Sequence, residues 1–397
     1  MTTATALPAS ELVGRFSKPQ GFGDATLRSP RADSIELLGG IPDPHVLPVA
    51  QLAAATERVL FRSGVPALQY SRTEGIAELR QWIAAREGVA VDRIIITNGG
   101  FHGLSLAIQA LINPGDLVAV DNPIFPLFLR GLELATTNIL PIPVGAAGLD
   151  LDALESQLRA GARPKALYTV PDFHNPTQGS LSQADRQRLV DLAAHYGFVL
   201  LADNPYRELY FGSAGASHRE FNDSENVIHI NTFTKTLGPG LRLGWLVVPN
   251  WLKSDISALR SRQDSHSSTL VQSIVAEALT SDETLFDATL DKARATYGNR
   301  AQILATAIEV ETQGGLEVQI PDGGLFLWPR IASDRIDPAK LSESAKSHGV
   351  DYQQGAFFPS GPGTDAARHL RLSFGHVSEE NLKEGARRIG LAFKEQS

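Results

Sequence analysis

Cysteine is absent from the 397 residues of this sequence. Without thiols the chain cannot form disulfides, use a thiolate nucleophile or hold zinc through cysteine, although the cellular compartment stays open. Apolar runs stay well short of the roughly twenty residues that a membrane-spanning helix needs. Basic clusters are also missing, and the net charge of −8 argues against binding to nucleic acid or to an anionic membrane surface.

The N-terminal residues 1–8 lack a basic segment followed by an apolar core, so we expect no signal peptide and a cytoplasmic protein. The length suggests about two domains. A hydrophobic content of 43% with 20% charged residues is typical of a soluble globular protein with a sizeable core.

Short apolar runs alternate with helical patterns through the middle of the chain. The runs are 93–97, 117–120, 138–140, 166–170, 198–202, 227–230 and 244–248. Short apolar strands separated by helices predict a mainly parallel sheet with helices on both faces.

The flanking regions have mainly helical patterns. Residues 48–64 and 73–86 have the periodicity of amphipathic helices, and we expect Thr73 to cap the second. A long helical stretch is expected from Trp251 to about Val310, before a few more strands and helices. We therefore divide the chain into an N-terminal segment of residues 1–45, a large domain of residues 46–285 and a small α/β domain of residues 286–397.

Ligands of open α/β sheets bind beyond the carboxyl ends of the strands, so the residues after each run are candidates for a site. Asn98-Gly99-Gly100 follows the first run and opens a helix. Such a glycine-rich helix N-terminus can hold a phosphate, although a plain strand-to-helix turn explains the glycines equally well. The spacing is not G-x-G-x-x-G, which disfavours a dinucleotide site.

Three further strand ends carry candidate side chains, each with an ordinary alternative. Phe125 would place a ring over the same edge, unless it is a core phenylalanine. Asn175 precedes a proline and is therefore extended, so its amide can act as a donor, although a turn would explain it too. Asp203 ends an apolar run, where a carboxylate is costly to bury unless it pairs with a cation; a solvated loop aspartate is the alternative.

Lys235 follows the run 227–230, between threonines and a Gly-Pro-Gly turn. Desolvation at a strand end would lower its pKa and make it a nucleophilic amine, whereas this segment alone favours an ordinary loop lysine. An amine, a buried carboxylate, hydrogen-bond donors, an aromatic ring and a phosphate cradle are together what pyridoxal phosphate requires. The carboxylate keeps the pyridine nitrogen protonated, so that the ring acts as an electron sink.

Residues 175–177, 203–206 and 232–242 resemble, in order and spacing, motifs of the class I/II aminotransferases, which are fold type I enzymes that use pyridoxal 5′-phosphate. The resemblance extends over essentially the whole chain. It implies a three-layer αβα large domain that binds the cofactor on a mainly parallel seven-stranded sheet, with a smaller α/β C-terminal domain. It also implies that residues 1–45 pack near the small domain and the active site.

The resemblance implies a role for each matching residue. Lys235 forms the Schiff base and moves the proton, Asp203 pairs with the pyridine nitrogen, and Asn175 and Tyr206 bind the phenolic oxygen. Further cofactor contacts are implied for Gly99, Gly100, Phe101, Phe125, Thr232, Thr234 and Arg242, and for Tyr70 from a second subunit, which implies a homodimer with shared active sites. Arg371 would clamp the substrate carboxylate with its planar fork, beside Gly40 and Asn175.

Three positions depart from the family pattern: Gly100 stands where a serine is usual, Gln178 where a glycine is usual and Gln354 where a proline is usual. We expect His174 to face the substrate, and we expect residues 323–328 to form a turn and a core strand of the small domain. His102, His195 and His229 have no spaced partners, so no metal site is predicted.

The expected function is transfer of an amino group from an L-amino acid to a 2-oxo acid through Lys235. The same constellation serves β-lyases, decarboxylases and oxidative enzymes that use O2, which stay as alternatives. A ligand-sensing domain of a transcription regulator is disfavoured by the acidic charge and by the about 45 residues before the fold. The substrate is not specified; we expect an apolar or long side chain, with 2-oxoglutarate as acceptor.

Overall fold

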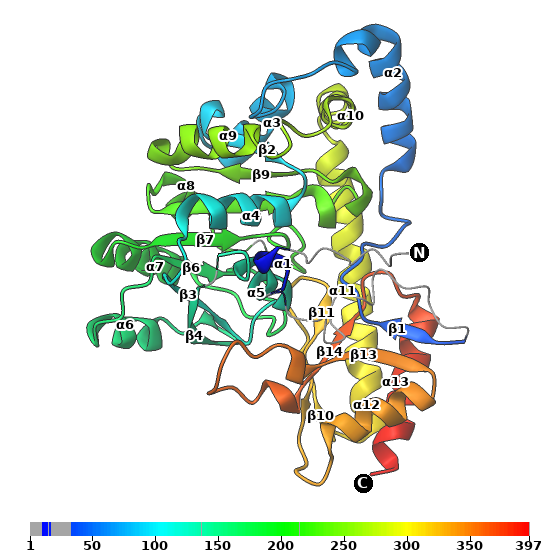
Figure 1. Cartoon of the computed structure of the whole chain (residues 1–397). Coiled ribbons are helices and arrows are strands. Elements are labelled where there is room, and N and C mark those ends of the chain that lie inside the picture. The colour runs from blue at the N-terminus through cyan, green and yellow to red at the C-terminus, as the bar shows by residue number, and fades with distance from the viewer. Residues whose placement is uncertain (1–9, 15, 17–32, 136, 214, 397) are drawn as a thin grey trace, which may run out of the picture.

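The computed structural model describes residues 10–14, 16, 33–135, 137–213 and 215–396. An eight-stranded sheet, a four-stranded sheet and a two-stranded ribbon make up this part of the chain, with helices packed around them (Figure 1). The long helix α11 (Leu285–Thr312) extends from the helices beside the large sheet down to those beside the small one. Residues 1–9, 15 and 17–32 of the expected N-terminal segment lie outside the described part.

The large sheet has the order β2-β9-β8-β7-β6-β3-β4-β5. Its strands are β2 (Ile94–Thr97), β3 (Leu117–Asn122), β4 (Asn138–Gly145), β5 (Gly148–Leu149), β6 (Ala166–Thr169), β7 (Val199–Asp203), β8 (Val227–Thr232) and β9 (Gly244–Val247). The pairings β3–β4, β3–β6, β6–β7 and β7–β8 are parallel, and β9 is antiparallel to both β2 and β8. The carboxyl ends of β2, β8, β7, β6 and β3 therefore lie at one edge.

All seven apolar runs form strands of this sheet, and the predicted three-layer α/β fold with a smaller α/β part is confirmed. The sheet has eight strands rather than seven because β5 makes a short antiparallel hairpin with β4. A strand of two residues is too short to produce a periodic pattern in the sequence.

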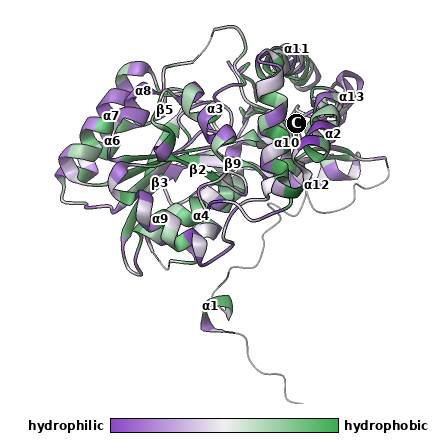
Figure 2. Cartoon of the chain, turned by 90° about the horizontal axis from the view of Figure 1, so that it is seen from above, coloured by the Kyte–Doolittle hydropathy of each residue, from purple (hydrophilic) through white to green (hydrophobic). Residues whose placement is uncertain are grey.

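Alternate residues of the central strands face opposite sides, so the sheet needs helices on both faces. On β7, Val199 and Leu201 join the larger apolar core, whereas Leu200 and Ala202 join a second core on the other face. The apolar strands lie between helices whose outer sides are polar (Figure 2). Around the large sheet these helices are α2 (Val49–Ala67), α3 (Ala77–Glu87), α4 (Gly100–Leu111), α5 (Pro126–Leu132), α6 (Leu151–Arg159), α7 (Gln183–Tyr196), α8 (Arg219–Asp223), α9 (Lys253–Ser261) and α10 (Thr269–Ser281).

The four-stranded sheet has the order β1-β13-β14-β11 and combines residues 35–37 with strands from the C-terminal part of the chain. Its strands are β1 (Ile35–Leu37), β13 (Val350–Gln354), β14 (Leu370–Ser373) and β11 (Phe326–Leu327). The two-stranded ribbon consists of β10 (Leu316–Glu317) and β12 (Arg330–Ile331). The remaining long helices are α12 (Pro338–Ser347) and α13 (Glu379–Lys394), and α1 (Glu11–Gly14) is a single turn. Because β1 pairs with β13, the segment 38–42 runs from the small sheet past the edge of the large one. The domain boundaries at residues 45 and 285 stay a prediction.

Two helical predictions differ from the structure. The stretch after Trp251 is divided into α9, α10 and α11, with Ser268 capping α10 by accepting from the N–H of Val271. Helix α3 begins at Ala77 rather than at Thr73, because Gly75 has a left-handed φ of +107°. That conformation is incompatible with a right-handed helix, so Thr73 cannot be its cap.

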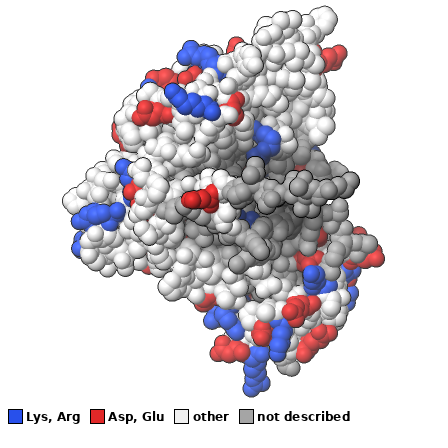
Figure 3. Space-filling model, viewed as in Figure 1, with Lys and Arg blue, Asp and Glu red and all other residues white. Residues whose placement is uncertain are grey.

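Among the described residues, no helix has both the length and the apolar character of a bilayer span. On the face shown in Figure 3, acidic and basic side chains lie interspersed, most densely over the part of the chain that holds α12 and α13. A mixed pattern of this kind does not focus charge of one sign.

Candidate active site

A cavity of about 430 Å³ opens at the carboxyl edge of the large sheet, beneath the segment 38–42. The chain reaches this edge from strand ends that are far apart in sequence but adjacent in the sheet. Most of the predicted site residues line the cavity: Gly40, Gly100, Phe101, Phe125, Asn175, Asp203, Tyr206, Thr232, Thr234, Lys235, Arg242 and Arg371. Gly99 lies directly beside it as the N-cap of α4, and Tyr70 lies elsewhere.

Lys235 ends a short 3₁₀ turn (Phe233–Lys235) that follows β8. Its Nζ donates a hydrogen bond to the carbonyl oxygen of Gly40 at 2.6 Å. Burial lowers the pKa of this amine to about 8, with Arg371 adding to the effect and Asp203 opposing it. At pH 7 such a lysine is neutral for roughly a tenth of the time, against well under a thousandth for an ordinary lysine.

Asp203 is the last residue of β7, and its side chain is buried at the floor of the cavity. The hydroxyl of Tyr168 donates to Asp203 Oδ2 at 3.0 Å. Burial raises the pKa of Asp203 to about 7; the Tyr168 bond and Lys235 lower it, and Asp121 raises it further. This hydrogen bond comes from a neutral phenol, so a cation placed against the carboxylate would favour its ionised form.

Tyr168, which sequence reasoning missed, holds Asp203 from the neighbouring strand β6. Its ring stacks on that of Phe128 with the centroids 3.6 Å apart and the planes 9° apart. A buried tyrosine hydroxyl needs a hydrogen-bond partner, and that requirement was the available signal. The apolar run 166–170 concealed it, because nothing in the run tells which way the ring points.

Arg371 lies on β14 of the small sheet and lines the cavity from that side. Its Nη1 donates to Asn175 Oδ1 at 3.0 Å and its Nη2 to the carbonyl oxygen of Leu38 at 2.5 Å. Its guanidinium lies over the ring of Phe326, 4.2 Å from the centroid. Burial lowers its pKa to about 10, so it stays charged at neutral pH. The two oxygens are neutral, so they orient the guanidinium without cancelling its charge.

The N-terminus of α4 forms a polar corner of the cavity. Gly99 caps this helix with a φ of +87°, and it has no side chain that could cap the first N–H groups of the helix. Arg242 Nη2 donates to the carbonyl oxygen of Asn98 at 3.0 Å, and the hydroxyls of Thr232 and Thr234 are 2.8 Å apart. A Cβ at position 99 would lie 2.9 Å from the Arg242 guanidinium, so glycine permits this approach. A helix N-terminus with an arginine and hydroxyls suits a phosphate.

The aromatic residues differ in how they relate to the cavity. Phe125 directly precedes α5 and lines the cavity. Phe101 lies at the rim of the cavity, with 47% of its surface exposed. Tyr70 does not line the cavity of its own chain; it is 89% exposed, with its ring edge-on to His266 at 5.7 Å.

One expectation from the sequence is wrong, and one residue of the cavity was missed. His174 does not face the cavity: its Nε2 lies 3.1 Å from Asp121 Oδ2, both side chains are fully buried, and its Nδ1 is 2.9 Å from Thr177 Oγ1. The expected strand of residues 323–328 is present as β11, and Phe326 belongs to the buried core; it also lines the cavity, which sequence reasoning missed. It lies on the edge strand β11, and only the arrangement of the two sheets turns that edge toward the site.

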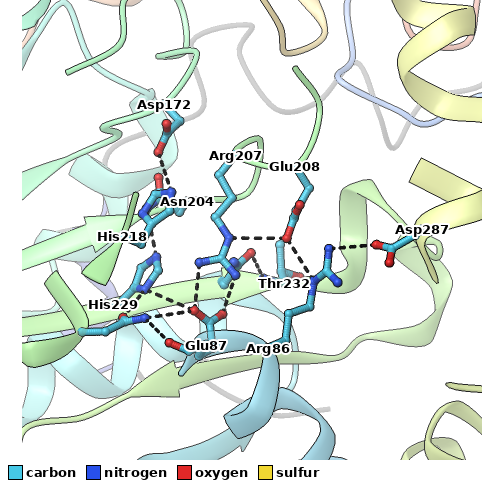
Figure 4. Close-up of polar contacts among 12 residues, drawn as sticks. Arg86, Glu87, Asp172, Asn204, Arg207, Glu208, His218, His229, Thr232 and Asp287 are labelled. Carbon is cyan, nitrogen blue, oxygen red and sulfur yellow. Dashed lines mark hydrogen bonds and ion pairs between the residues drawn. The ribbon is translucent and has the colours of Figure 1, made fainter. Parts of the chain in front are cut away.

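A buried polar network lies behind the end of β7 (Figure 4). Arg207 binds both carboxylate oxygens of Glu87, at 2.8 and 2.7 Å. Burial alone would raise the pKa of Glu87, but Arg207 and His229 lower it to about 2. Asn204, the neighbour of Asp203, lies 2.9 Å from His229 Nε2. The network therefore fixes the backbone that carries Asp203 and Tyr206.

The network continues to the surface beside a second cavity, of about 760 Å³. Asn204 also lies 3.1 Å from His218 Nδ1, and His218 Nε2 is 3.3 Å from Asp172. Asp172 in turn pairs with the buried Arg186 at 2.6 Å. Burial lowers the pKa of His218 well below its usual range, so the ring is neutral. Because the charged residues named here bind one another, we interpret their role at this second cavity as stabilisation of the fold.

Comparison with known proteins gives one family. The model for aminotransferase class I and II matches residues 39–389. The chain is 33% identical over 370 residues to the 2-aminoadipate transaminase of Thermus thermophilus, covering 92% of this chain and 91% of that protein. It is 30% identical over 377 residues to aromatic-amino-acid aminotransferase 1 of Thermococcus litoralis, covering 92% and 89%.

The fold is also similar to solved structures. One is the α-aminoadipate aminotransferase from Thermus thermophilus in complex with N-(5′-phosphopyridoxyl)-L-leucine, with a TM-score of 0.88 and 32% identity. The superposition covers 98% of this chain and 97% of that one.

Proposed function

The chain belongs to the class I and II aminotransferases, and on this premise we propose how its residues carry out the reaction. It is a pyridoxal-phosphate-dependent aminotransferase that moves an amino group from an amino acid to a 2-oxo acid. The observation that carries the residue assignment is Lys235, a buried amine with a pKa of about 8, in the same cavity as the buried carboxyl of Asp203. When bound, the cofactor stabilises negative charge on the substrate α-carbon and accepts its amino group.

The residues of the cavity fit this cofactor. Asp203 is a buried carboxyl with a raised pKa whose hydrogen bond comes from a neutral phenol, and a protonated ring nitrogen would provide the opposite charge. The glycine-rich start of α4 has N–H groups without a side-chain cap and suits the phosphate. We assign the phosphate to Gly99, Gly100, Phe101, Thr232, Thr234 and Arg242, the ring to Phe125 and Asp203, and the phenolic oxygen to Asn175 and Tyr206.

Lys235 is the proposed proton carrier. Its Nζ accepts the α-proton of the amino acid and later donates a proton back on the same side. The bond to the Gly40 carbonyl at 2.6 Å supports this role, because it holds the amine beside the substrate side of the cavity when the amine is free. General acid–base groups work best with a pKa near the operating pH, and burial brings that of Lys235 to about 8.

Arg371 is the proposed clamp for the substrate α-carboxylate. Its planar fork can bind both carboxylate oxygens, and Asn175 and Leu38 hold that fork in position. Holding the carboxylate sets the direction of the Cα–H bond, which positions the proton for Lys235.

We propose donors with apolar, aromatic or long side chains, and 2-oxoglutarate as acceptor. Apolar residues form much of the cavity wall, among them Leu38, Ile41, Leu127 and Phe326. The similar proteins are named for aromatic amino acids and for 2-aminoadipate, which is consistent with such a wall.

A panel of amino donors, each offered with 2-oxoglutarate, tests the proposal. Glutamate and the 2-oxo acid of the donor should form in equal amounts, and Lys235→Ala should form neither. Release of ammonia or CO₂, or consumption of O₂, without glutamate would instead identify a lyase, a decarboxylase or an oxidative enzyme.

We also propose a homodimer with shared active sites, in which Tyr70 reaches the phosphate corner of the partner subunit. Apolar side chains at the end of α2 and just beyond it support this, since Phe61, Val65, Leu68 and Tyr70 are 91%, 73%, 67% and 89% exposed. An exposed apolar patch of this kind usually marks an interaction surface. A monomeric mass by light scattering would refute the dimer.

Two further assignments complete the proposal. We place the protein in the cytoplasm, and we divide it at residues 45 and 285, with the first part packing near the small domain and the cavity. The strand β1 (Ile35–Leu37), which joins the C-terminal sheet, supports this division. Cell fractionation and limited proteolysis test the two statements.

A further inference from the structure

Gln178 occupies a backbone conformation that a glutamine rarely adopts. Its φ is +68°, in the left-handed region. Residues other than glycine pay roughly 1 kcal/mol or more there, because the Cβ crowds the backbone. The chain keeps a glutamine at this position although glycine would remove the strain, so a contact of the side chain is expected to offset it.

The side chain of Gln178 connects the loop of the large sheet to the edge of the small one. Its Nε2 donates to the carbonyl oxygen of Phe326 at 2.8 Å. Phe326 belongs to β11, which is the edge strand of the small sheet and pairs with β14 on one side only. The amide therefore binds a main-chain acceptor of an edge strand.

This bond closes a ring of contacts around the substrate end of the cavity. The ring of Phe326 lies beneath the guanidinium of Arg371, 4.2 Å from centroid to Cζ. Arg371 donates to Asn175 Oδ1 at 3.0 Å, and Asn175 lies three residues before Gln178 on the same loop. The ring of Phe326 also packs closely against Gly40, where an added Cβ would lie 2.5 Å from Phe326 Cζ.

The loop itself does not depend on the Gln178 side chain. The N–H of Gln178 donates to the carbonyl of His174 at 2.7 Å, and the N–H of His174 donates to the carbonyl of Gly179 at 2.9 Å. Upstream of β11, the N–H of Gly324 donates to the carbonyl of Leu209 at 2.8 Å, which anchors the turn before the strand. The amide of Gln178 is thus a second anchor, placed at Phe326 itself.

We propose that Gln178 is a positioning residue: by fixing Phe326 it holds the guanidinium of Arg371 in the plane that binds the substrate carboxylate. This inference rests on the proposed role of Arg371. It predicts that the side chain of Gln178 affects substrate binding and not the chemistry at Lys235, because among the described residues its hydrogen bond goes to Phe326 and not to Lys235 or Gly40.

Two variants separate positioning from stability. Gln178→Gly removes the bond and relieves the left-handed strain, whereas Gln178→Ala removes the bond and keeps the strain. The alanine variant should therefore melt below the wild type, whereas in the glycine variant the lost bond and the relieved strain, each about 1 kcal/mol, nearly cancel. Both variants should raise KM for the donor by roughly three- to tenfold, which corresponds to the loss of about one hydrogen bond. The kcat at saturation should change by less than about twofold, because uniform binding is what is lost.

Gln313 provides the matched control. It is an exposed glutamine with a φ of +52° at the end of α11, far from the cavity. Gln313→Gly relieves the same kind of strain and should leave KM unchanged.

Substrate binding can also be measured without turnover. The cofactor-loaded enzyme is titrated with an α-methyl amino acid, and binding is followed by the absorbance of the cofactor. Both Gln178 variants should weaken this binding by the same factor as KM.

The outcomes distinguish this inference from the proposed function. If the wild-type enzyme transfers no amino group, the proposed function fails. If the wild type is active and both Gln178 variants bind the α-methyl amino acid as tightly as the wild type does, Gln178 does not position Arg371. A KM that follows the melting temperature, rising in the alanine variant and staying at the wild-type value in the glycine variant, would also overturn the inference.

Discussion

Replacing Asp203 with asparagine should stabilise the cofactor-free protein while it abolishes activity. The carboxyl is buried, and burial raises its pKa to about 7, against the usual 3.8. Asparagine has almost the same shape and can still accept the hydrogen bond from Tyr168. It cannot pair with a protonated ring nitrogen, so amino transfer should fall by several orders of magnitude.

The gain in stability depends on pH. Below about pH 4 the carboxyl of Asp203 is protonated in both the folded and the unfolded chain, so the substitution should have little effect. Between pH 4 and 7 the unfolded chain binds fewer protons than the folded one, so the free energy of unfolding of the wild type falls as the pH rises. The pKa difference of about 3 units sets an upper limit of about 4 kcal/mol, reached above pH 7.

Urea denaturation of the cofactor-free proteins at pH 5 and pH 8 measures this effect. The difference between Asp203→Asn and the wild type should be larger at pH 8. Asp334→Asn, at a fully exposed carboxyl, is the control and should show no such growth. A variant that is less stable than the wild type at both pH values, or more stable by the same amount at both, would refute the reasoning.

Three further predictions follow from single contacts. Gly100→Ser should tighten cofactor binding several-fold in an equilibrium titration, because a Cβ there meets Thr232 at an ordinary 3.6 Å and adds a hydroxyl at the phosphate corner; weaker binding would contradict that placement. Arg371→Lys should raise KM for the donor at least tenfold in steady-state assays, since an ammonium cannot bind a carboxylate through two parallel bonds; an unchanged KM would dismiss the clamp. Glu87→Ala should lower the free energy of unfolding by about 3–5 kcal/mol in denaturant, because it leaves Arg207 buried without its carboxylate; a loss below about 1 kcal/mol would show that the pair is not needed.

The positions of the chemical groups were predictable because they follow strand ends. Asp203 comes directly after an apolar run, and Asn175 and Lys235 each come five residues after one; the parallel strands bring those ends to one edge of the sheet. Strand order was not needed for this prediction, since any mainly parallel arrangement would place these residues on the same side.

Side-chain direction was not predictable in the same way. His174 and Asn175 are neighbours, yet Asn175 lines the cavity and His174 pairs with Asp121 in the interior. Residues 175–177 form a turn, in which neighbouring side chains leave the backbone in different directions, so a correct position did not tell which side chain enters the cavity. Phe326 was missed for a related reason, because the packing of one sheet against another decides where an edge strand points.

Backbone conformation explains the remaining differences. The helical pattern of residues 73–86 begins as a helix only after Gly75, whose φ of +107° is left-handed. At Gly75 the chain passes close to Ile96, and an added Cβ would lie 2.4 Å from Ile96 Cγ1. Sequence periodicity reports side-chain spacing only, and it is silent about a close approach between segments distant in sequence.

Burial moves the two central groups of the cavity in opposite directions, and this links catalysis to stability. It lowers the pKa of Lys235 to about 8 and raises that of Asp203 to about 7, so both charged forms are disfavoured in the folded chain at neutral pH. For Lys235 the unfolded chain binds more protons between about pH 8 and 10.5, so its contribution to stability improves as the pH rises through that range. For Asp203 the contribution worsens between about pH 4 and 7. The cofactor-free fold should therefore carry both penalties together between about pH 7 and 8. A ligand with a cationic ring nitrogen that also removes the charge on Lys235 relieves both, so cofactor binding should stabilise the fold most in the pH range where the groups are poised for proton transfer.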